Sequence, residues 1–428
     1  MKNSGIEWIG EIPDNWEIIP NKYLFENHSV KVGATWDKYK LLSLTTMGVK
    51  EKDSSVAGGK VPDSYENYQT VVPGDMIFCL FDLDCSAVFS GVSPYHGMIT
   101  SAYDVYEINK KLADNLYVDY LFQYAFSNRY YKIYSKNIRY TVTTEMFKSI
   151  RTPIPPLDTQ MKIGTLLSNK CSKVDKLIEV QQAQIEKLKE YKQSVINEAV
   201  TKGLDPSAPM KDSGVEWIGE IPEDWEVCRV KNIGFTQNGI SKSGELFGNG
   251  YPFISYGDVY KHWVLPQTGS GLIESTEKDR KIFSVNKGDI FFTRTSETIE
   301  EVGFSSVCFE TITNATFAGF LIRLRPYQPD SIIKSNYAKY YFRANLLRKY
   351  LVREMNIVTR ASLSQELLGA MSVVLPPTNT QIEISLHLDS QCKKIDSLIS
   401  IKQKKIDMLN EYKKSLIYEY VTGKKEVV

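Results

Sequence analysis

The stretch that decides the fold is written twice. It runs from Ile154 to Thr201, beginning IPPLDTQMKIG and ending EYKQSVINEAVT, and returns 221 residues later, from Leu375 to Thr422, as LPPTNTQIEIS and EYKKSLIYEYVT. Each copy opens with a proline pair, which stops the preceding element because proline lacks an amide hydrogen and restricts the residue before it. No further proline follows in either copy, and Glu, Lys, Gln and Leu dominate. This composition predicts two long helices, which Gly203 and Gly423 can end.

Apolar residues recur at alternating spacings of three and four along both copies. This spacing favours two helices packed side by side along a seam. Polar residues interrupt the seam at equivalent places, Gln181 and Lys192 in the first copy and Lys402 and Lys413 in the second. The alternative is two ordinary amphipathic helices that face separate cores. The apolar seam positions are Val174, Ile178, Ile185, Leu188 and Val195 in the first copy, and Ile395, Ile399, Ile406, Leu409 and Leu416 in the second.

A second repeat lies ahead of each long segment. KNSGIEWIGEIPDNW at Lys2–Trp16 returns as KDSGVEWIGEIPEDW at Lys211–Trp225. Between the repeats the chain diverges, apart from faint echoes such as Gly74-Asp75 and Gly288-Asp289, which both precede apolar residues. Similar frames around dissimilar interiors predict two domains with related but different tasks. A tandem duplication whose interiors merely drifted is the alternative.

Composition limits the class of protein. The 428 residues suggest two or three domains. The net charge of +1 is weak evidence against a freestanding nucleic-acid binder, although a DNA reader inside a larger complex can be neutral if partners supply phosphate contacts. The six cysteines form no Cys-x-x-Cys pair, which disfavours a zinc ribbon. No apolar run reaches the roughly 18 residues of a membrane span, so we expect a cytoplasmic protein without membrane contact.

No catalytic constellation is visible. The chain contains no Gly-x-x-x-x-Gly-Lys-Ser/Thr phosphate loop. The proline pairs lack the acidic or amide residue before them and the aromatic after them that an amino-methyltransferase needs, and the four histidines share no metal-ligand spacing. We therefore predict no catalytic residue, no metal site and no cofactor in this chain. A nuclease or methyltransferase with a disguised site is a further, weaker alternative.

Basic residues interleaved with aromatics precede each proline pair. Phosphate neutralisation requires such cations, and base edges require forked donors such as arginine. The alternative to DNA contact is a helix whose basic face is exposed to solvent. Arg139 and Arg360 occupy equivalent positions and are predicted to contact phosphate. The predicted DNA-binding residues are Lys132, Lys136, Arg139, Thr141, Asn238, Lys242, Tyr256, Arg294, Ser296, Arg348, Lys349, Arg360 and Ser362.

Together these motifs resemble the specificity subunit of type I restriction-modification enzymes. The resemblance rests on Trp-Ile-Gly-Glu-Ile-Pro-x-x-Trp at Trp8–Trp16 and Trp217–Trp225, and on Pro-Pro-x-x-x-Gln at Pro155–Gln160 and Pro376–Gln381. It implies an α/β (α+β) fold with two target-recognition domains alternating with two long helices, which pair as an antiparallel coiled coil with pseudo-twofold symmetry. It also implies a double-stranded DNA target in two halves, one read by each domain.

The resemblance further implies partners. Two methyltransferase subunits that bind S-adenosylmethionine, and restriction subunits that use ATP and magnesium, would dock on the helices. The domain division expected from the repeats is 1–154 for the first recognition domain, 155–203 for the central helix, 204–210 for a linker, 211–375 for the second recognition domain and 376–424 for the C-terminal helix. A non-catalytic scaffold that binds proteins is the competing hypothesis.

Overall fold

The chain folds into two compact units. The computed structural model describes residues 1–46, 48–52, 64–86, 88–135, 140–296, 302–354 and 361–427. Unit 1 comprises Met1–Gln182 and Gln403–Val428, and unit 2 comprises Ala183–Lys402. Both unit boundaries fall within the long helices α4 (Leu157–Lys202) and α11 (Thr378–Val421), so each unit contains one end of each helix.

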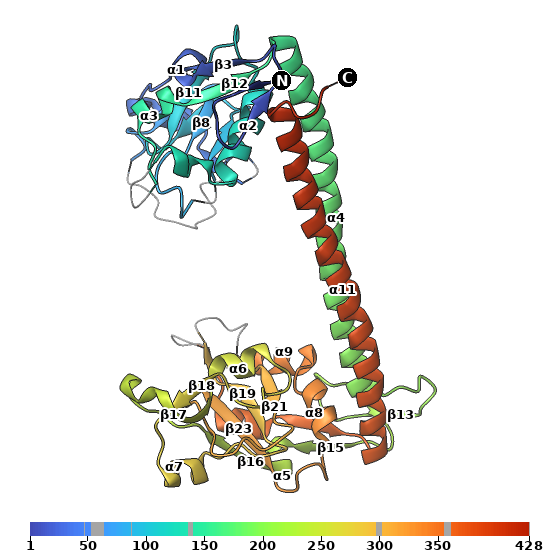
Figure 1. Ribbon diagram of the computed structural model, residues 1–428. Coiled ribbons are helices and arrows are strands. Elements are labelled where there is room, and N and C mark those ends of the chain that lie inside the picture. Colours follow the sequence, from blue (N-terminus) through green and yellow to red (C-terminus); the bar gives the residue numbers. More distant parts are fainter. Residues whose placement is uncertain are drawn as a thin grey trace. The chain divides into compact units, whose positions relative to one another are not determined.

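Short strands and helices precede α4 in unit 1 (Figure 1). They are β1 Lys2–Asn3, β2 Glu11–Ile12, β3 Glu17–Pro20, α1 Asn21–Leu24, β4 Phe25–Asn27, the 3-10 helix η1 Gly33–Lys38, β5 Leu42–Thr45, β6 Gly48–Glu51, β7 Gln69–Val71, β8 Met76–Phe78, β9 Ser90–Val92, β10 Gly97–Ile99, β11 Asp104–Ile108, α2 Asn115–Ser127, the 3-10 helix η2 Tyr130–Ile133, α3 Thr144–Ser149 and β12 Arg151–Ile154.

Unit 2 follows a related but not identical order between α4 and α11, because α6 and α7 have no counterpart among the described elements of unit 1. Its elements are β13 Met210–Asp212, β14 Glu220–Pro222, β15 Glu226–Arg229, α5 Val230–Ile233, β16 Gly234–Asn238, the 3-10 helix η3 Gly244–Leu246, β17 Phe247–Ile254, α6 Tyr256–Lys261, β18 Gly271–Ile273, α7 Glu277–Ile282, β19 Ile290–Thr293, β20 Thr295–Ser296, β21 Ser305–Val307, β22 Thr316–Phe317, β23 Leu321–Pro326, α8 Ser335–Tyr341, α9 Asn345–Glu354, β24 Ala361–Ser362, α10 Gln365–Ala370 and β25 Ser372–Leu375.

Both units are built on the same antiparallel four-stranded sheet. The strand order is β4-β11-β8-β9 in unit 1 and β16-β23-β19-β21 in unit 2. A two-stranded pair joins the start of each domain to the strand before its long helix, β3 with β12 and β15 with β25. The fold is therefore of mixed helix and strand type, as predicted.

The core of each domain continues onto both long helices. In unit 1, Ile163 and Leu167 of α4 and Leu416 and Val421 of α11 are buried in the same cluster as the sheet and α2. Unit 2 has the same arrangement with the opposite helix ends, through Val200 of α4 and through Ile384, Leu388 and Cys392 of α11. Since burial of one large apolar side chain contributes roughly 1.5–3 kcal/mol, these contacts fix each domain to its helix ends.

One glutamine in each long helix joins that helix to its domain. The Gln160 side chain accepts from the Asp114 N–H at 2.8 Å and donates to the carbonyls of Leu112 and Pro155, both at 2.8 Å. Gln381 repeats this pattern by accepting from the Lys334 N–H at 2.8 Å and donating to the carbonyls of Ile332 and Pro376. Both amides are buried. The glutamine after the proline pair thus has a structural role, because it satisfies backbone groups that burial would otherwise leave unpaired.

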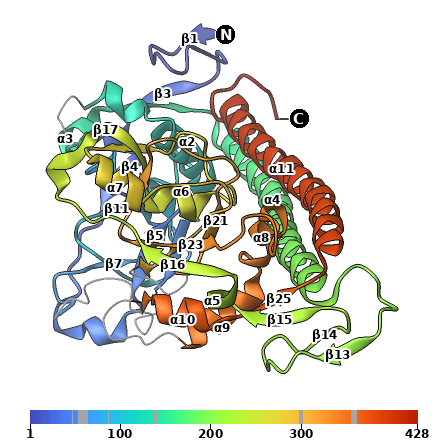
Figure 2. The ribbon, with the colours of Figure 1, turned by 90° about the horizontal axis from the view of Figure 1, so that it is seen from below.

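A buried tyrosine in each unit bridges the domain to the end of the other long helix. The Tyr117 hydroxyl of α2 lies 2.8 Å from the Pro153 carbonyl of β12 and 3.2 Å from the Val421 carbonyl of α11. Tyr337 of α8 makes the equivalent contacts to Val374 of β25 and to Val200 of α4, at 3.4 and 3.3 Å. Figure 2 shows α8 beside the helix pair. The free carbonyls of each helix C-terminus are thereby partly satisfied.

The repeated tryptophan motif packs on the helix C-termini. Gly423, with φ +69°, lies against Trp16, and Gly203, with φ +79°, lies against Trp225. A Cβ at Gly423 would meet Pro13 at 2.4 Å, and one at Gly203 would meet Trp225 at 3.2 Å. Glycine is therefore favoured at both helix ends by its left-handed backbone and by this close packing.

Within each unit the two long helices run antiparallel. In unit 2, Lys192 pairs with Asp396 at 2.7 Å and Lys402 with Gln184 at 2.6 Å. In unit 1, Lys413 pairs with Asp175 at 2.7 Å. The Lys192 and Lys413 pairs lie at equivalent positions of the repeat, and both lysines are the polar interruptions seen in the sequence. Every predicted seam position is buried or half-buried, whereas most of the helix positions between them are exposed.

Candidate DNA interface

Several predicted DNA-binding residues meet at one edge of unit 2. Arg294 follows β19, and its N–H bonds the Phe320 carbonyl at 2.9 Å, while its own carbonyl accepts from Leu363 at 2.8 Å. Strands β20 and β24 pair with Thr295 opposite Ser362. We call Arg294, Ser296, Phe320 and Ser362 the domain 2 edge. Asn238 ends β16 next to this edge, because the following Gly239 donates to Leu321 at 3.3 Å.

Unit 1 has a counterpart at the same place in its sheet. The Leu80 carbonyl accepts from Val142 at 2.8 Å, as the Arg294 carbonyl accepts from Leu363. Thr141 occupies the position of Ser362 and has further interactions within the chain. The turn before β11 is closed by a Tyr103 N–H to Thr100 bond of 3.2 Å, as the turn before β23 is closed by Leu321 and Ala318 at 3.0 Å. We call Phe81, Ser101, Ala102 and Thr141 the domain 1 edge.

Two of the predicted lysines are held by carboxylates. Lys132 in η2 pairs with Asp84 at 3.1 Å and lies 4.5 Å from the Tyr140 ring centroid; its hydrogen bond is the main cause that lowers the pKa of Asp84. Lys242 pairs with Asp279 at 2.8 Å and donates to the Glu274 carbonyl. The hydrogen bond from Lys242 lowers the pKa of Asp279 to about 2. These pairs orient both lysines internally, and their contact with DNA remains a prediction.

Among the residues that the structure describes, the other predicted DNA-binding residues take no part in the contacts that define the domain 1 edge or the domain 2 edge. Tyr256 is the first residue of α6 and stacks on Tyr260, with ring centroids 6.1 Å apart. Arg348 of α9 lies over the Phe304 ring, 4.4 Å from its centroid. The remaining residues can be placed only in part: the side chains of Ser296 and Lys349 are not described, and Lys136, Arg139 and Arg360 lie outside the described residues.

The Gly-Asp echo forms the same turn in both units. Asp75 and Asp289 are buried, and each accepts from the backbone N–H three residues earlier, at 2.8 and 2.7 Å. The preceding Gly74 and Gly288 have φ of +99° and +87°, a backbone conformation that glycine adopts without steric cost. The motif therefore begins the central strands β8 and β19, and its role is structural.

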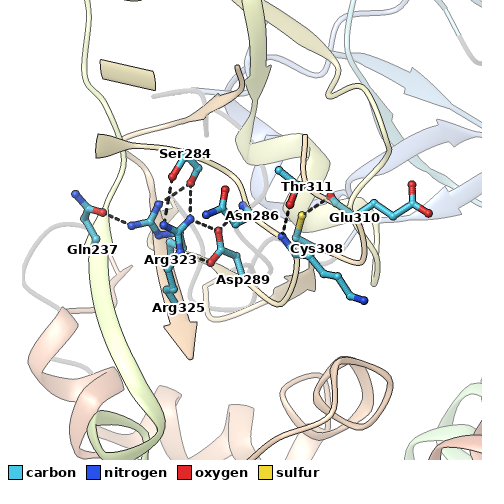
Figure 3. Close-up of polar contacts among 10 residues, drawn as sticks. Gln237, Ser284, Asn286, Asp289, Cys308, Glu310, Thr311, Arg323 and Arg325 are labelled. Carbon is cyan, nitrogen blue, oxygen red and sulfur yellow. Dashed lines mark hydrogen bonds and ion pairs between the residues drawn. The ribbon is translucent and has the colours of Figure 1, made fainter. Parts of the chain in front are cut away.

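The two turns differ in the side chain that faces the aspartate. In unit 1, His28 Nδ1 lies 3.0 Å from Asp75. In unit 2, Arg325 donates two hydrogen bonds to the Asp289 carboxylate, at 2.7 and 2.6 Å, and also donates to Ser284 (Figure 3). Neighbouring Arg323 is buried and donates to Gln237 and to the Ser284 carbonyl. Burial lowers the pKa of Arg323 to about 10.

Neither a metal-ligand cluster nor a membrane-spanning helix occurs among the described residues. No group of three or more His, Cys, Asp or Glu side chains among them could hold a metal ion. Within the same residues, no helix combines the length and the hydropathy needed to cross a membrane.

Comparison with known proteins agrees with the motifs. Residues 222–411 match the family model described as the type I restriction modification DNA specificity domain. The type I restriction enzyme MjaVIII specificity subunit of Methanocaldococcus jannaschii is 27% identical over 375 residues, which cover 84% of this chain and 81% of that protein. The chain is related to type I restriction specificity subunits.

Solved structures of such systems share the fold. One chain, described in work on complex assembly and conformational transition of the type I restriction-modification system, has a TM-score of 0.71 at 16% identity and covers 96% of this chain and 98% of its own length. The HsdS specificity subunit of Thermoanaerobacter tengcongensis has a TM-score of 0.51 at 15% identity over 99% of this chain and all of its own. At these identities the likeness establishes the fold alone.

Sequence reasoning about this specificity-subunit relative missed Phe320. Its side chain is 65% exposed on the domain 2 edge. A phenylalanine after Ala-Gly at the end of an apolar stretch looks like a core residue, and the sequence carries no sign of its exposure.

Proposed function

We propose that the chain is the DNA sequence-specificity subunit of a type I restriction-modification complex and reads a target of two half-sites, one with each unit. One observation carries this proposal: the units share their sheet order and their helix joints but differ at their edges, where Arg294, Ser296 and Ser362 lie in unit 2 and Thr141 lies in unit 1. The recognition domains are proposed as residues 1–154 and 211–375. The compartment is proposed to be the cytoplasm, where its DNA and its partners act.

We propose that α4 and α11 form an antiparallel coiled coil with pseudo-twofold symmetry. The equivalent Lys192–Asp396 and Lys413–Asp175 pairs support this arrangement, as do the matched Gln160 and Gln381 joints. A seam of this kind holds two readers at a set spacing. DNA presents the same face about every 34–36 Å, so the length of the seam would determine the gap between half-sites.

We propose that the exposed apolar residues of the helices dock two methyltransferase subunits. Large exposed side chains recur at equivalent positions of the repeat, which is the pattern that two identical partners require. S-adenosylmethionine, ATP and magnesium would be bound by the methyltransferase and restriction subunits. The equivalent exposed pairs are Met161 and Ile382, Leu177 and Leu398, Val180 and Ile401, and Tyr191 and Tyr412.

The docking proposal can be tested by co-purification. Val180→Asp together with Ile401→Asp should abolish capture of the methyltransferase, because charge at the centre of an interface is strongly unfavourable. Gln182→Ala together with Gln403→Ala, at exposed positions of the same helices, is the matched control. Normal capture by the double aspartate variant would show that this face is not the dock.

The recognition function is tested by mapping methylated adenines in the host genome. Deleting the gene should erase one bipartite methylation motif. Replacing residues 26–138 with the matching region of a relative should change one half of that motif and leave the other half unchanged. A motif that changes in both halves, or in neither, contradicts the division of labour. Purified chain alone should show neither methyl transfer nor ATP hydrolysis.

The predicted phosphate contacts have a separate test. Arg139 and Arg360 are equivalent in the repeat, and a residue shared by two different readers suits the part of the contact that is independent of sequence. Arg139→Ala should weaken binding to all target variants alike and reduce its salt dependence. Altered preference at one base pair without loss of overall affinity would instead assign Arg139 to base reading.

A further inference from the structure

The turn before β11 in unit 1 and the turn before β23 in unit 2 carry different residues at corresponding places in the two sheets. In unit 2, Ala318 and Leu321 close this turn by a 3.0 Å hydrogen bond, and in unit 1 Thr100 and Tyr103 close it by a 3.2 Å bond. The two turns thus share their closing hydrogen bond, while the two tip residues are Gly319-Phe320 in unit 2 and Ser101-Ala102 in unit 1. Substitution of the exposed second tip residue changes the presented surface without changing the fold.

The backbone around Phe320 is tightly braced. Gly319 donates to the Ile240 carbonyl at 2.8 Å, and Ile240 donates to Phe317 at 2.9 Å. A Cβ at Gly319 would lie 2.3 Å from the Ser241 hydroxyl, and one at Gly239 would lie 2.1 Å from the Ala318 carbonyl. These close approaches leave no room for larger residues, so the turn is held rigidly from both sides.

Phe320 is presented to solvent by this rigid turn. Its side chain is 65% exposed, although a phenylalanine loses roughly 1.5–3 kcal/mol of burial energy by staying in water. The backbone of Arg294 bonds to that of Phe320, and Ser362 is exposed on the adjoining strand. An aromatic ring beside an arginine and a hydroxyl has the chemistry of a base-reading surface, because the ring can stack on a base or contact a thymine methyl group.

We propose that Phe320 contacts a base pair of the half-site read by unit 2 and helps to set its specificity. This inference rests on the proposed DNA-recognition function and names one residue for it. In unit 1 an aromatic reaches the matching edge from another segment: Phe81 is 37% exposed and stacks on Tyr103 with centroids 6.1 Å apart. The two domains thus present aromatic rings at corresponding edges from different places in the chain.

The test uses the chain assembled with its methyltransferase partners and labelled duplexes that carry the motif found by methylation mapping. Each base pair of both half-sites is substituted in turn, and binding is measured for wild type and Phe320→Ala. We expect the variant to bind the target roughly 5- to 150-fold more weakly, because base–aromatic contacts contribute about 1–3 kcal/mol. Discrimination should fall at one or two neighbouring base pairs of one half-site only.

A matched control lies at the opposite end of the same strand. Tyr327 follows β23, is 59% exposed and lies near Phe235; Tyr327→Ala should leave affinity and discrimination unchanged. Phe320→Leu, which keeps an apolar side chain, should retain part of the discrimination. Wild-type affinity and discrimination in Phe320→Ala would overturn the inference, as would an equal loss on both half-sites. A wild-type complex that shows no sequence preference would instead refute the proposed function itself.

Discussion

Units 1 and 2 use the same types of residue to hold their long helices and different types of residue inside their sheets. Gln160 and Gln381 form identical joints, whereas the buried aspartate of the Gly-Asp turn faces His28 in unit 1 and Arg325 in unit 2. The Gln160 and Gln381 joints must each fit a long helix, and the sequence of that helix is itself repeated. The geometry of the joint is therefore constrained in the same way in both units. The interior of each sheet has only to remain packed. Its polar pairs can therefore differ between the units, as can the residues at the edge of the sheet.

Removing the side chain that faces the aspartate of each Gly-Asp turn should separate the units most clearly. Arg325→Ala leaves Asp289 buried without its bidentate partner and should lower the unfolding free energy of unit 2 by about 3–5 kcal/mol. His28→Ala should cost unit 1 less, roughly 1–3 kcal/mol, because Asp75 loses a single contact. Hydrogen exchange of the two sheets measures each unit by itself.

An exposed arginine of unit 2 provides the control for this comparison. Arg353 is 56% exposed and pairs with Glu354 at 3.0 Å, so Arg353→Ala should change stability by no more than about 1 kcal/mol. Equal losses for Arg325→Ala and His28→Ala would show that the two turns depend on these side chains to the same degree.

Helices α2 and α8 differ in the charge they place at one equivalent position. Asp119 in unit 1 receives a 2.9 Å hydrogen bond from Gln123, and burial raises its pKa to about 6. Lys339 in unit 2 instead pairs with Asp389 at 2.6 Å. Since the folded pKa of Asp119 exceeds the unfolded value of 3.8, unit 1 should be stabilised at acidic pH and lose that stability as the pH rises from about 4 to above 6.

The pH dependence of unit 1 is therefore expected to depend on Asp119. Its full amplitude should be about 3 kcal/mol, because the pKa of Asp119 rises from 3.8 to about 6 and one unit corresponds to about 1.4 kcal/mol, and Asp119→Asn should remove it. The measurement is the melting temperature of wild type and of Asp119→Asn at pH 5 and pH 8. Asp114→Asn is not a suitable control, because Asp114 caps α2. Asp158→Asn, at an exposed position of α4, is the suitable control. An unchanged pH profile in Asp119→Asn would assign the dependence to other groups.

The sequence predicts the helices far better than the edges. Helix α4 begins directly after Pro156 and α11 directly after Pro377, and both end beside their glycines, because local propensity and spacing determine these features. The exposure of Phe320 depends instead on backbone bonds to Ile240 and Arg294, which lie far away in the chain. Pairing between distant segments leaves no periodic pattern, so the edges could be predicted only as stretches of suitable composition.

The smallest expected effect concerns the equivalent ion pairs between the long helices. In unit 1, Lys413 and Asp175 have exposed fractions of 30% and 33%, while in unit 2 Asp396 is 56% exposed opposite Lys192 at 18%. Half-exposed pairs contribute about 0.2–1 kcal/mol, and the more sheltered carboxylate of unit 1 should give the larger coupling.

Asp175→Lys should destabilise unit 1, and adding Lys413→Asp should restore most of the loss, since the pair is rebuilt with reversed charges. The Asp396→Lys and Lys192→Asp cycle should show the same sign with a smaller coupling, and both couplings should weaken in 1 M salt. Reversing Lys414 and Glu411, a pair within α11 itself, is the control. If the double reversals are no more stable than the single ones, these pairs do not couple the helices, and the apolar seam alone sets their register.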